Sequence, residues 1–155
     1  MDYVNLTECP IEPGEVVTKV LDPECGAIAT FFGTTRAYDA GKVVLRLEYE
    51  SYSKMAVIVL HDIIAECRSR WPTLQHLAVV HRLGSVSAGE ISIALAASSP
   101  HRAAALNAVQ YVLDSIKSRA PIWKKEFYED NSSRWKQNKE CLHYCRLPNE
   151  RDSVE

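Results

Sequence analysis

The order in which helical and strand patterns alternate constrains the fold more than any other feature of this sequence. The apolar residues of 53–70 recur at helical spacing, and a second helical stripe follows Ser99 and ends at Ala120-Pro121. The strand patterns fall in adjacent pairs that no helix separates, which is typical of antiparallel pairing. The sequence therefore predicts an α+β fold in which a mixed, largely antiparallel sheet packs with two long helices and one short helix.

The expected strands are short apolar or alternating runs that glycine, proline or charged residues bound. They cover 2–7, 26–32, 43–49 and 77–81, a run that begins at Ile91, and 122–128. The short helix follows Pro13, because proline suits a first helical turn. We expect the second long helix to begin with Ser99 as its N-cap and Pro100 at its first helical position.

Length, charge and cysteine usage narrow the class of protein. We expect residues 1–135 to form a single domain and 136–155 a polar, partly disordered tail. The net charge of −2 does not favour nucleic acid or an anionic membrane surface as a partner. No apolar run approaches the ~18–20 residues of a membrane span, and the N-terminus lacks the pattern of a signal peptide. Five irregularly spaced cysteines favour reduced thiols in the cytosol.

Two basic residues at a helix N-terminus form the first candidate site. His101 and Arg102 lie where the second long helix is expected to begin. Unpaired N–H groups and the positive end of the helix dipole bind anions at such a position. First turns normally favour acidic residues, so two cations here oppose the dipole unless a bound anion such as a phosphate neutralises them. The alternative is that both side chains point into solvent.

Three lysines near the end of the same helix form the second candidate site. Lys117 lies in the last turn, where a cation is favourable for structural reasons alone. Strand alternation places Lys124 and Lys125 on opposite faces of the following strand. It returns Glu126 to the face of Lys124, so these two residues could pair. Lys117 close to Lys124 would lower the pKa of an amine, as a catalytic base requires. The alternative is a solvated lysine pair at the sheet edge.

A third candidate is Arg36, which follows a buried strand and the short run Gly33-Thr34-Thr35. An arginine in such a loop suits bidentate contact with phosphate, although the glycines form no nucleotide-binding fingerprint. Cys141, His143 and Cys145 lack a second ligand pair, so we expect no metal site and no cofactor. The remaining histidines in or beside apolar elements are interpreted as structural: His61, His76 and His81.

Five blocks of the sequence resemble, in matching order, the catalytic (large) subunit of molybdopterin synthase. They are 26–36, 47–52, 81–84, 101–102 and 117–126. The last block is the most specific, because Lys117 is followed at the matching spacing by Ala120-Pro121-Ile122-Trp123-Lys124-Lys125-Glu126. The first 25 residues and the chain after Trp135 show no sharp resemblance.

The resemblance implies a hammerhead-like fold and a sulfurtransferase reaction in the cytosol. In that family a small ubiquitin-like subunit ends in a Gly-Gly thiocarboxylate, and its tail inserts into the large subunit. Two sulfurs pass in turn to cyclic pyranopterin monophosphate, which forms molybdopterin during molybdenum cofactor biosynthesis. A homodimer of large subunits with a small subunit at each end makes a heterotetramer, with no nucleic acid or membrane as a partner.

The resemblance also implies roles for individual residues. Lys117 and Lys124 are the expected catalytic residues, and both are expected to contact the substrate. The other expected substrate-binding residues are Arg36, His101, Arg102, Lys125 and Glu126. One departure is Thr34, where some relatives carry a lysine, and it removes a possible phosphate contact.

Two other classes of function fit part of this pattern. A phosphate-binding hydrolase or lyase would use the same basic residues, but no metal motif or activated nucleophile supports it. A noncatalytic adaptor for a ubiquitin-like tail leaves the His101-Arg102 pair unexplained, because that pair suits a small anion. The sulfurtransferase reading requires Arg36, the His101-Arg102 pair and Lys117 to converge on one cavity.

Overall fold

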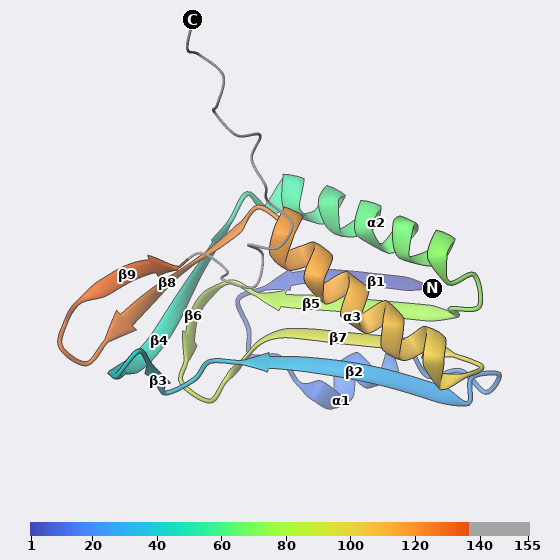
Figure 1. Ribbon diagram of the computed structural model, residues 1–155, viewed down its shortest axis with the longest axis horizontal. Helices are drawn as coiled ribbons and strands as arrows, with labels where there is room; N and C mark the ends of the chain where they lie inside the picture. Colours follow the sequence, from blue (N-terminus) through green and yellow to red (C-terminus); the bar gives the residue numbers. More distant parts are fainter. Residues whose placement is uncertain (137–155) are drawn as a thin grey trace, which may run out of the picture.

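The computed structural model describes residues 1–136, whose strands form two sheets that pack with three helices (Figure 1). The helices are α1 (Pro13–Thr18), α2 (Ser53–Arg70) and α3 (Arg102–Arg119). The strands are β1 (Asp2–Thr7), β2 (Ala27–Thr34), β3 (Tyr38–Asp39), β4 (Lys42–Ser51), β5 (His76–Arg82), β6 (Gly84–Ser87), β7 (Ile91–Ser99), β8 (Ile122–Tyr128) and β9 (Ser133–Lys136).

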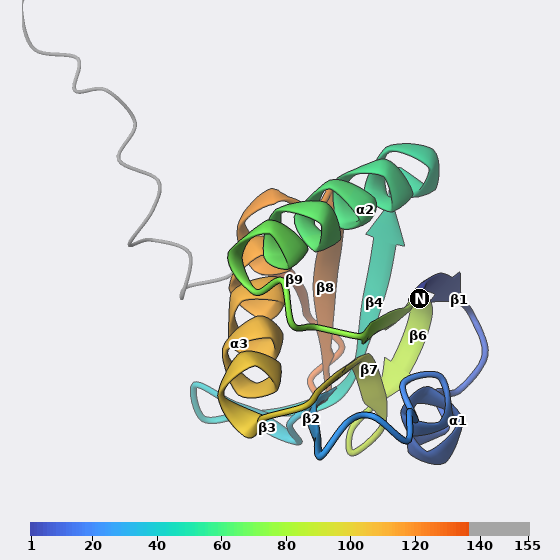
Figure 2. The same ribbon diagram turned by 90° about the vertical axis from the view of Figure 1, so that its right-hand side faces the viewer.

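The main sheet has the strand order β1-β5-β7-β2, with β1 parallel to β5 and the other neighbours antiparallel. Helices α2 and α3 cover one face of this sheet, and α1 covers the other (Figure 2). Alternation along β5 serves both faces: Leu77 and Val79 point to the long helices, whereas Ala78 and Val80 point to α1. The strand is therefore apolar throughout because both of its faces are buried.

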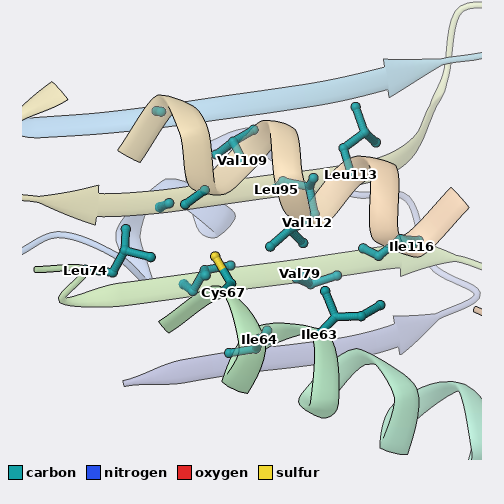
Figure 3. Close-up of a cluster of buried hydrophobic side chains, with 14 of the residues drawn as sticks. Ile63, Ile64, Cys67, Leu74, Val79, Leu95, Val109, Val112, Leu113 and Ile116 are labelled. Atoms are coloured by element: carbon teal, nitrogen blue, oxygen red, sulfur yellow. The ribbon is translucent and has the colours of Figure 1, made fainter. Parts of the chain in front are cut away.

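The core between the long helices and the main sheet is built from the apolar stripes that the sequence predicts (Figure 3). Ile63 and Cys67 of α2 and Val112 of α3 are fully buried in it. Burial of one such aliphatic side chain contributes about 1.5–3 kcal/mol to folding. The same burial raises the pKa of the Cys67 thiol to about 11, so this thiol is a packing group rather than a nucleophile.

The second sheet has the strand order β3-β4-β8-β9, with β6 pairing on β4. The chain leaves the main sheet at Arg82 and enters the second sheet at Gly84. Gly84 has a φ of +72°, a left-handed conformation that glycine adopts without strain. Strand β8 follows α3 after only two residues, so the second sheet adjoins the C-terminal end of that helix (Figure 1).

The predicted fold class is confirmed, because the structure is α+β with a mixed main sheet, two long helices and one short helix. The strands nevertheless divide between two sheets, where the sequence predicts one. The short strands β3, β6 and β9 also lie where no strand is predicted. Each has two to four residues, too few for a periodic pattern, and each exists because β4 or β8 offers it a pairing edge.

The predicted start of the second long helix is wrong by two residues. Ser99 is the last residue of β7, paired with Ala27 of β2, and the N-cap of α3 is His101. The Ser99 hydroxyl donates to the carbonyl of His101 at 2.5 Å, so it bonds a carbonyl group rather than a helix N–H. Sheet pairing therefore holds Ser99 in the strand, against the capping preference of serine.

The predicted polar tail, 136–155, lies outside the described residues except for Lys136, which ends β9. Cys141, His143 and Cys145 lie outside them as well. Within residues 1–136, the side chains form no group of three or more potential metal ligands. No helix in this part of the chain is long and apolar enough to cross a membrane.

Candidate functional site

A group of four cations, the lysine cluster, lies where the C-terminal end of α3 meets the second sheet. It consists of Lys117 in the last turn of α3, Lys124 on β8, Lys136 on β9 and Arg36 in the loop after β2. In the strand register, Lys124 lies opposite Tyr49 of β4 on one side and opposite Lys136 on the other. Residues directly opposite in a sheet share a face, so both lysines point to the same side.

The electrostatic environment of Lys124 destabilises its ammonium form. Partial burial of Lys124 lowers its pKa, and the positive charges of Lys117, Lys136 and Arg36 lower it further against the opposing effect of Glu126. Among residues 1–136, none forms an ion pair with Lys124. The predicted influence of Lys117 on the pKa of Lys124 is confirmed. An amine in this setting can accept a proton at a pH closer to neutrality than an exposed lysine can.

The carboxylate beside Lys124 has other partners. Glu126 lies on the face of Lys124, as strand alternation predicts, and is buried. Its Oε2 accepts a hydrogen bond from the Tyr128 hydroxyl at 2.7 Å and lies 3.6 Å from Lys136 Nζ. Burial and this hydrogen bond raise the pKa of Tyr128 to about 12. Glu126 therefore forms an ion pair with Lys136 and not with Lys124, which corrects the possible pairing read from the sequence.

A second carboxylate, Asp39 of β3, also binds Lys136 and makes a close ion pair with its ammonium. Its other oxygen, Oδ1, lies 3.5 Å from Arg36 Nη2. The Arg36 side chain is 80% exposed, whereas those of Asp39 and Lys136 are 16% and 11% exposed. Arg36 thus extends into solvent at the rim of the lysine cluster, while the Asp39–Lys136 pair lies beneath it.

Two rings from different sheets meet beside Lys124. The rings of Tyr49 on β4 and His81 on β5 form an edge-to-face contact, with centroids 4.9 Å apart. Burial lowers the pKa of His81 to about 4, with a smaller contribution from the charge of Lys124, so its imidazole is neutral near pH 7. The His81 Nδ1 lies 2.8 Å from the carbonyl of Arg82, and a neutral ring donates its proton there. His81 therefore acts as an uncharged packing group beside the cluster.

Lys125 lies on the opposite face of β8 from Lys124. Its ammonium stands 5.4 Å from the ring centroid of Phe127 and 5.6 Å from that of Trp135. These are cation–π distances on the outer face of the second sheet. Lys125 is therefore separated from the lysine cluster, as strand alternation predicts for neighbours on one strand.

His101 and Arg102 lie at the other end of α3 and are exposed. The first turn of this helix has no side-chain cap and no acidic residue, so its N–H groups and dipole are available to an anion. The Pro100 carbonyl, just before this helix, lies very close to Gly26, just before β2. A Cβ on Gly26 would lie 2.8 Å from the Pro100 oxygen, so only glycine allows this approach. Both side chains are exposed, as the alternative interpretation expects, and the anion site at this end stays a prediction.

The expectation that all these cations converge on one cavity is wrong for a single chain. Arg102 and Lys117 are fifteen positions apart on one continuous helix. At the rise of an α-helix this places the two residues about 22 Å apart. Figure 1 shows the first turn of α3 at the end of the main sheet that is remote from β8. The structure brings together Arg36, Lys117, Lys124 and Glu126, and it holds His101 and Arg102 away from them.

The sequence interpretation did not single out two residues of this region, Asp39 and Lys136. Asp39 lies between two of the predicted strands, and Lys136 is the first residue of the predicted polar tail. The signal for Lys136 was its alternation with Trp135 after the turn at Glu129 and Asp130, which is the pattern of a second hairpin strand. Nothing in the sequence pairs Asp39 with Lys136, which lie 97 residues apart.

Comparison with known proteins places these observations in a family. The family model described as MoaE protein matches residues 6–119. Proteins named molybdopterin synthase catalytic subunit are 48% identical in Taeniopygia guttata, over 91% of this chain and 90% of the relative, and 49% identical in Bos taurus, over 91% and 74%. A Drosophila persimilis protein of the same name is 46% identical over 92% of this chain, but the chain spans only 40% of that relative.

Solved structures agree with the sequence relatives. The X-ray crystal structure of molybdopterin synthase from Staphylococcus aureus matches with a TM-score of 0.81 at 34% identity, over 86% of this chain and 96% of the other. A complex of subunits 1 and 2 of molybdopterin-converting factor from Helicobacter pylori matches with a TM-score of 0.70 over 89% of this chain and 91% of the other. At 18% identity, that likeness shows a shared fold.

Proposed function

This chain belongs to the MoaE family, and on that premise we propose that it is the catalytic subunit of a molybdopterin synthase. It transfers two sulfurs to cyclic pyranopterin monophosphate, one after the other and each from the C-terminal thiocarboxylate of a small ubiquitin-like subunit, forming molybdopterin. In each transfer the sulfur bonds to a pterin carbon, and water breaks its bond to the acyl carbon, which leaves the small subunit with an ordinary carboxylate. The reaction takes place in the cytosol. The names of the relatives support the reaction, and the chemistry of the lysine cluster supports the site.

The environment of Lys124 carries this proposal. Both reactants are anions, a phosphate ester and a thiocarboxylate, and the lysine cluster presents several positive charges to them. An ammonium from Lys117 or Lys124 steadies the thiocarboxylate while its sulfur attacks the pterin carbon. In its neutral form the Lys124 amine accepts a proton from the substrate, and the lowered pKa of Lys124 makes that form more accessible. Glu126 lies beside the reacting groups and is bound to Tyr128 and Lys136.

The separation of the two ends of α3 supports a site that two copies of the chain share. His101 and Arg102 bind the phosphate or the pterin through charged hydrogen bonds and the helix N-terminus. Because they lie about 22 Å from Lys117 in their own chain, they serve a site at the lysine cluster only when a second copy contributes them. A homodimer of large subunits with a small subunit at each end, a heterotetramer, provides two such shared sites.

Arg36 completes the proposed binding set. Its exposed guanidinium at the rim of the lysine cluster can leave its 3.5 Å contact with Asp39 to bind a phosphate in a bidentate way. The proposal gives Lys125 no contact with the reacting groups, because its ammonium stands over Phe127 and Trp135 on the outer face.

Reconstitution tests the proposed reaction. The chain is mixed with a small subunit that carries a C-terminal thiocarboxylate and with cyclic pyranopterin monophosphate, and the molybdopterin formed is measured. We expect product in proportion to the thiocarboxylate supplied, at two sulfurs per pterin. A matched small subunit that ends in an ordinary carboxylate should give none. Absence of product with intact thiocarboxylate and pterin would overturn the proposed function.

A further inference from the structure

Of the two cations in the lysine cluster whose ion pairs are described above, Lys136 is far more enclosed than Arg36. Only 11% of its side chain is exposed, and it bridges the carboxylates of Asp39 and Glu126. These carboxylates come from distant parts of the second sheet, β3 at one edge and β8 next to the other, whereas Lys136 ends the edge strand β9. An ammonium held by two nearly buried carboxylates is poorly placed to bind an anionic substrate itself, so its role in the site is indirect.

The register explains why Lys136 matters to Lys124. The two lysines lie directly opposite each other on β9 and β8, and Glu126 is the next residue on the same face of β8. Same-face neighbours along a strand are within reach of each other's long side chains. Glu126 could therefore turn to either lysine, and in the structure it is bound to Lys136 and to the Tyr128 hydroxyl.

We propose that Lys136 is a positioning residue of the lysine cluster: by binding Glu126 and Asp39, it prevents Glu126 from forming an ion pair with Lys124 and so leaves Lys124 to the substrate. The proposal deepens the proposed function, on which the role of Lys124 rests. Lys136 lowers the pKa of Lys124 in two ways. Its positive charge disfavours the Lys124 ammonium, and its ion pair offsets the charge of Glu126, which would otherwise stabilise that ammonium.

Other charged and titratable groups also face Lys124, and they set the background for a test. They come from every element packed around it: Arg36 from the loop after β2, Tyr49 from β4, His81 from β5, Lys117 from α3 and Glu126 from β8. Near neutral pH, His81 and Tyr49 are uncharged, because burial lowers the pKa of the first and raises that of the second. Glu126 is therefore the group whose pairing decides how strongly the Lys124 ammonium is stabilised.

The test is an NMR titration of Lys124 in protein with isotope-labelled lysine, with the resonance assigned by its loss in Lys124→Arg. In Lys136→Gln we expect the midpoint of the Lys124 titration to rise by about one pH unit, because a repelling charge is lost and Glu126 is released. Lys136→Arg retains the charge and should restore the original midpoint. Lys42→Gln is the matched control, because Lys42 is also ion-paired, to Asp130 at 2.9 Å, but lies outside the lysine cluster.

A second pair of variants keeps the test decisive if Lys136→Gln does not fold. Lys136→Gln with Asp39→Asn removes both partners of the close ion pair and still releases Glu126, so the midpoint should rise as in the single variant. Replacing Glu126 by Gln should lower the midpoint and reduce the further effect of Lys136→Gln, since the two residues act through one interaction. An unchanged Lys124 midpoint in folded protein that lacks Lys136 would overturn the proposal.

The rate of molybdopterin formation separates this proposal from the proposed function. In Lys136→Gln the acid limb of the kcat/KM profile should move to higher pH with the Lys124 midpoint, whereas a purely structural defect lowers the rate at every pH alike. A wild-type chain that makes no molybdopterin would reject the function even if the midpoint moves. If the chain makes molybdopterin but the Lys124 titration midpoint is the same with and without Lys136, the positioning role alone is rejected.

Discussion

The two ends of α3 carry basic residues in opposite settings. At the N-terminal end, His101 and Arg102 are exposed, and the helix dipole disfavours them. At the C-terminal end, Lys117 stands where the dipole favours a cation, next to the partly buried Lys124. The first end suits the capture of an anion from solvent, and the second suits proton transfer in a place that limits water.

This difference shows that one helix can serve two sites without bending toward either. A rigid α-helix about 27 Å long holds its ends apart, so a shared function for both ends requires a second molecule. In the proposed shared site, the N-terminal end belongs to the site of the partner copy, and the C-terminal end to the site of its own chain. The variants below test whether the two ends of α3 contribute to one shared site or act independently.

The largest effect is expected at the lysine end. Lys117→Ala and Lys124→Ala should each lower the rate of molybdopterin formation by about 100-fold or more, because each removes a proton-transfer or charge-stabilising group. The rate is measured in the reconstituted system, and the thermal unfolding midpoint checks the fold. A near-normal rate for Lys117→Ala would remove Lys117 from the catalytic role.

A mixing experiment tests whether the two ends of α3, contributed by different copies of the chain, form one site. At a cyclic pyranopterin monophosphate concentration below the wild-type KM, a variant with both His101→Ala and Arg102→Ala, and a second variant with Lys117→Ala, should each be nearly inactive. After subunit exchange in equal amounts, about half of the dimers are mixed, and each mixed dimer has one intact shared site. About a quarter of the wild-type rate should therefore return. No recovery, in a mixture shown to contain mixed dimers, would contradict the shared site.

A smaller effect is expected for the anion-binding end alone. Arg102→Ala should raise the KM for cyclic pyranopterin monophosphate about tenfold with little change in kcat, because a charged hydrogen bond to the phosphate stabilises bound substrate and transition state alike. Arg119→Ala is the matched control at the opposite end of α3, where Arg119 binds Glu66 at 2.7 Å. An equal rise in KM for both variants would show that overall charge, rather than the N-terminal position, is responsible.

The last prediction concerns the stability of the fold in acid, to which His81 contributes. Burial lowers the pKa of His81 to about 4, below the usual value of 6.5, so between these pH values the unfolded chain binds more protons than the folded one. Stability should therefore fall by about 3 kcal/mol as the pH drops from 6.5 to 4. The free energy of unfolding, measured with urea at several pH values in this range, should depend less steeply on pH in His81→Gln than in the wild type.

Local patterns were sufficient for the long elements. The bounds of α2 were predicted at both ends, because its apolar stripe runs unbroken from Ser53 and Trp71-Pro72 stops it. Strand β8 was predicted over its whole length, and its alternation assigned Lys124 and Lys125 to opposite faces. The start of α3 was missed because two preferences competed at Ser99, and sheet pairing with Ala27 overrode the capping preference.

The sequence by itself determined the longer elements and the two faces of β8, because these follow from periods of two and 3.6 residues along one stretch of chain. Only the tertiary structure decided that the strands form two sheets and that Lys136 meets Asp39 across 97 residues. It also decided that Glu126 turns to Lys136 and away from Lys124. Such pairs depend on which strands become neighbours and in which register, and no local period encodes that choice.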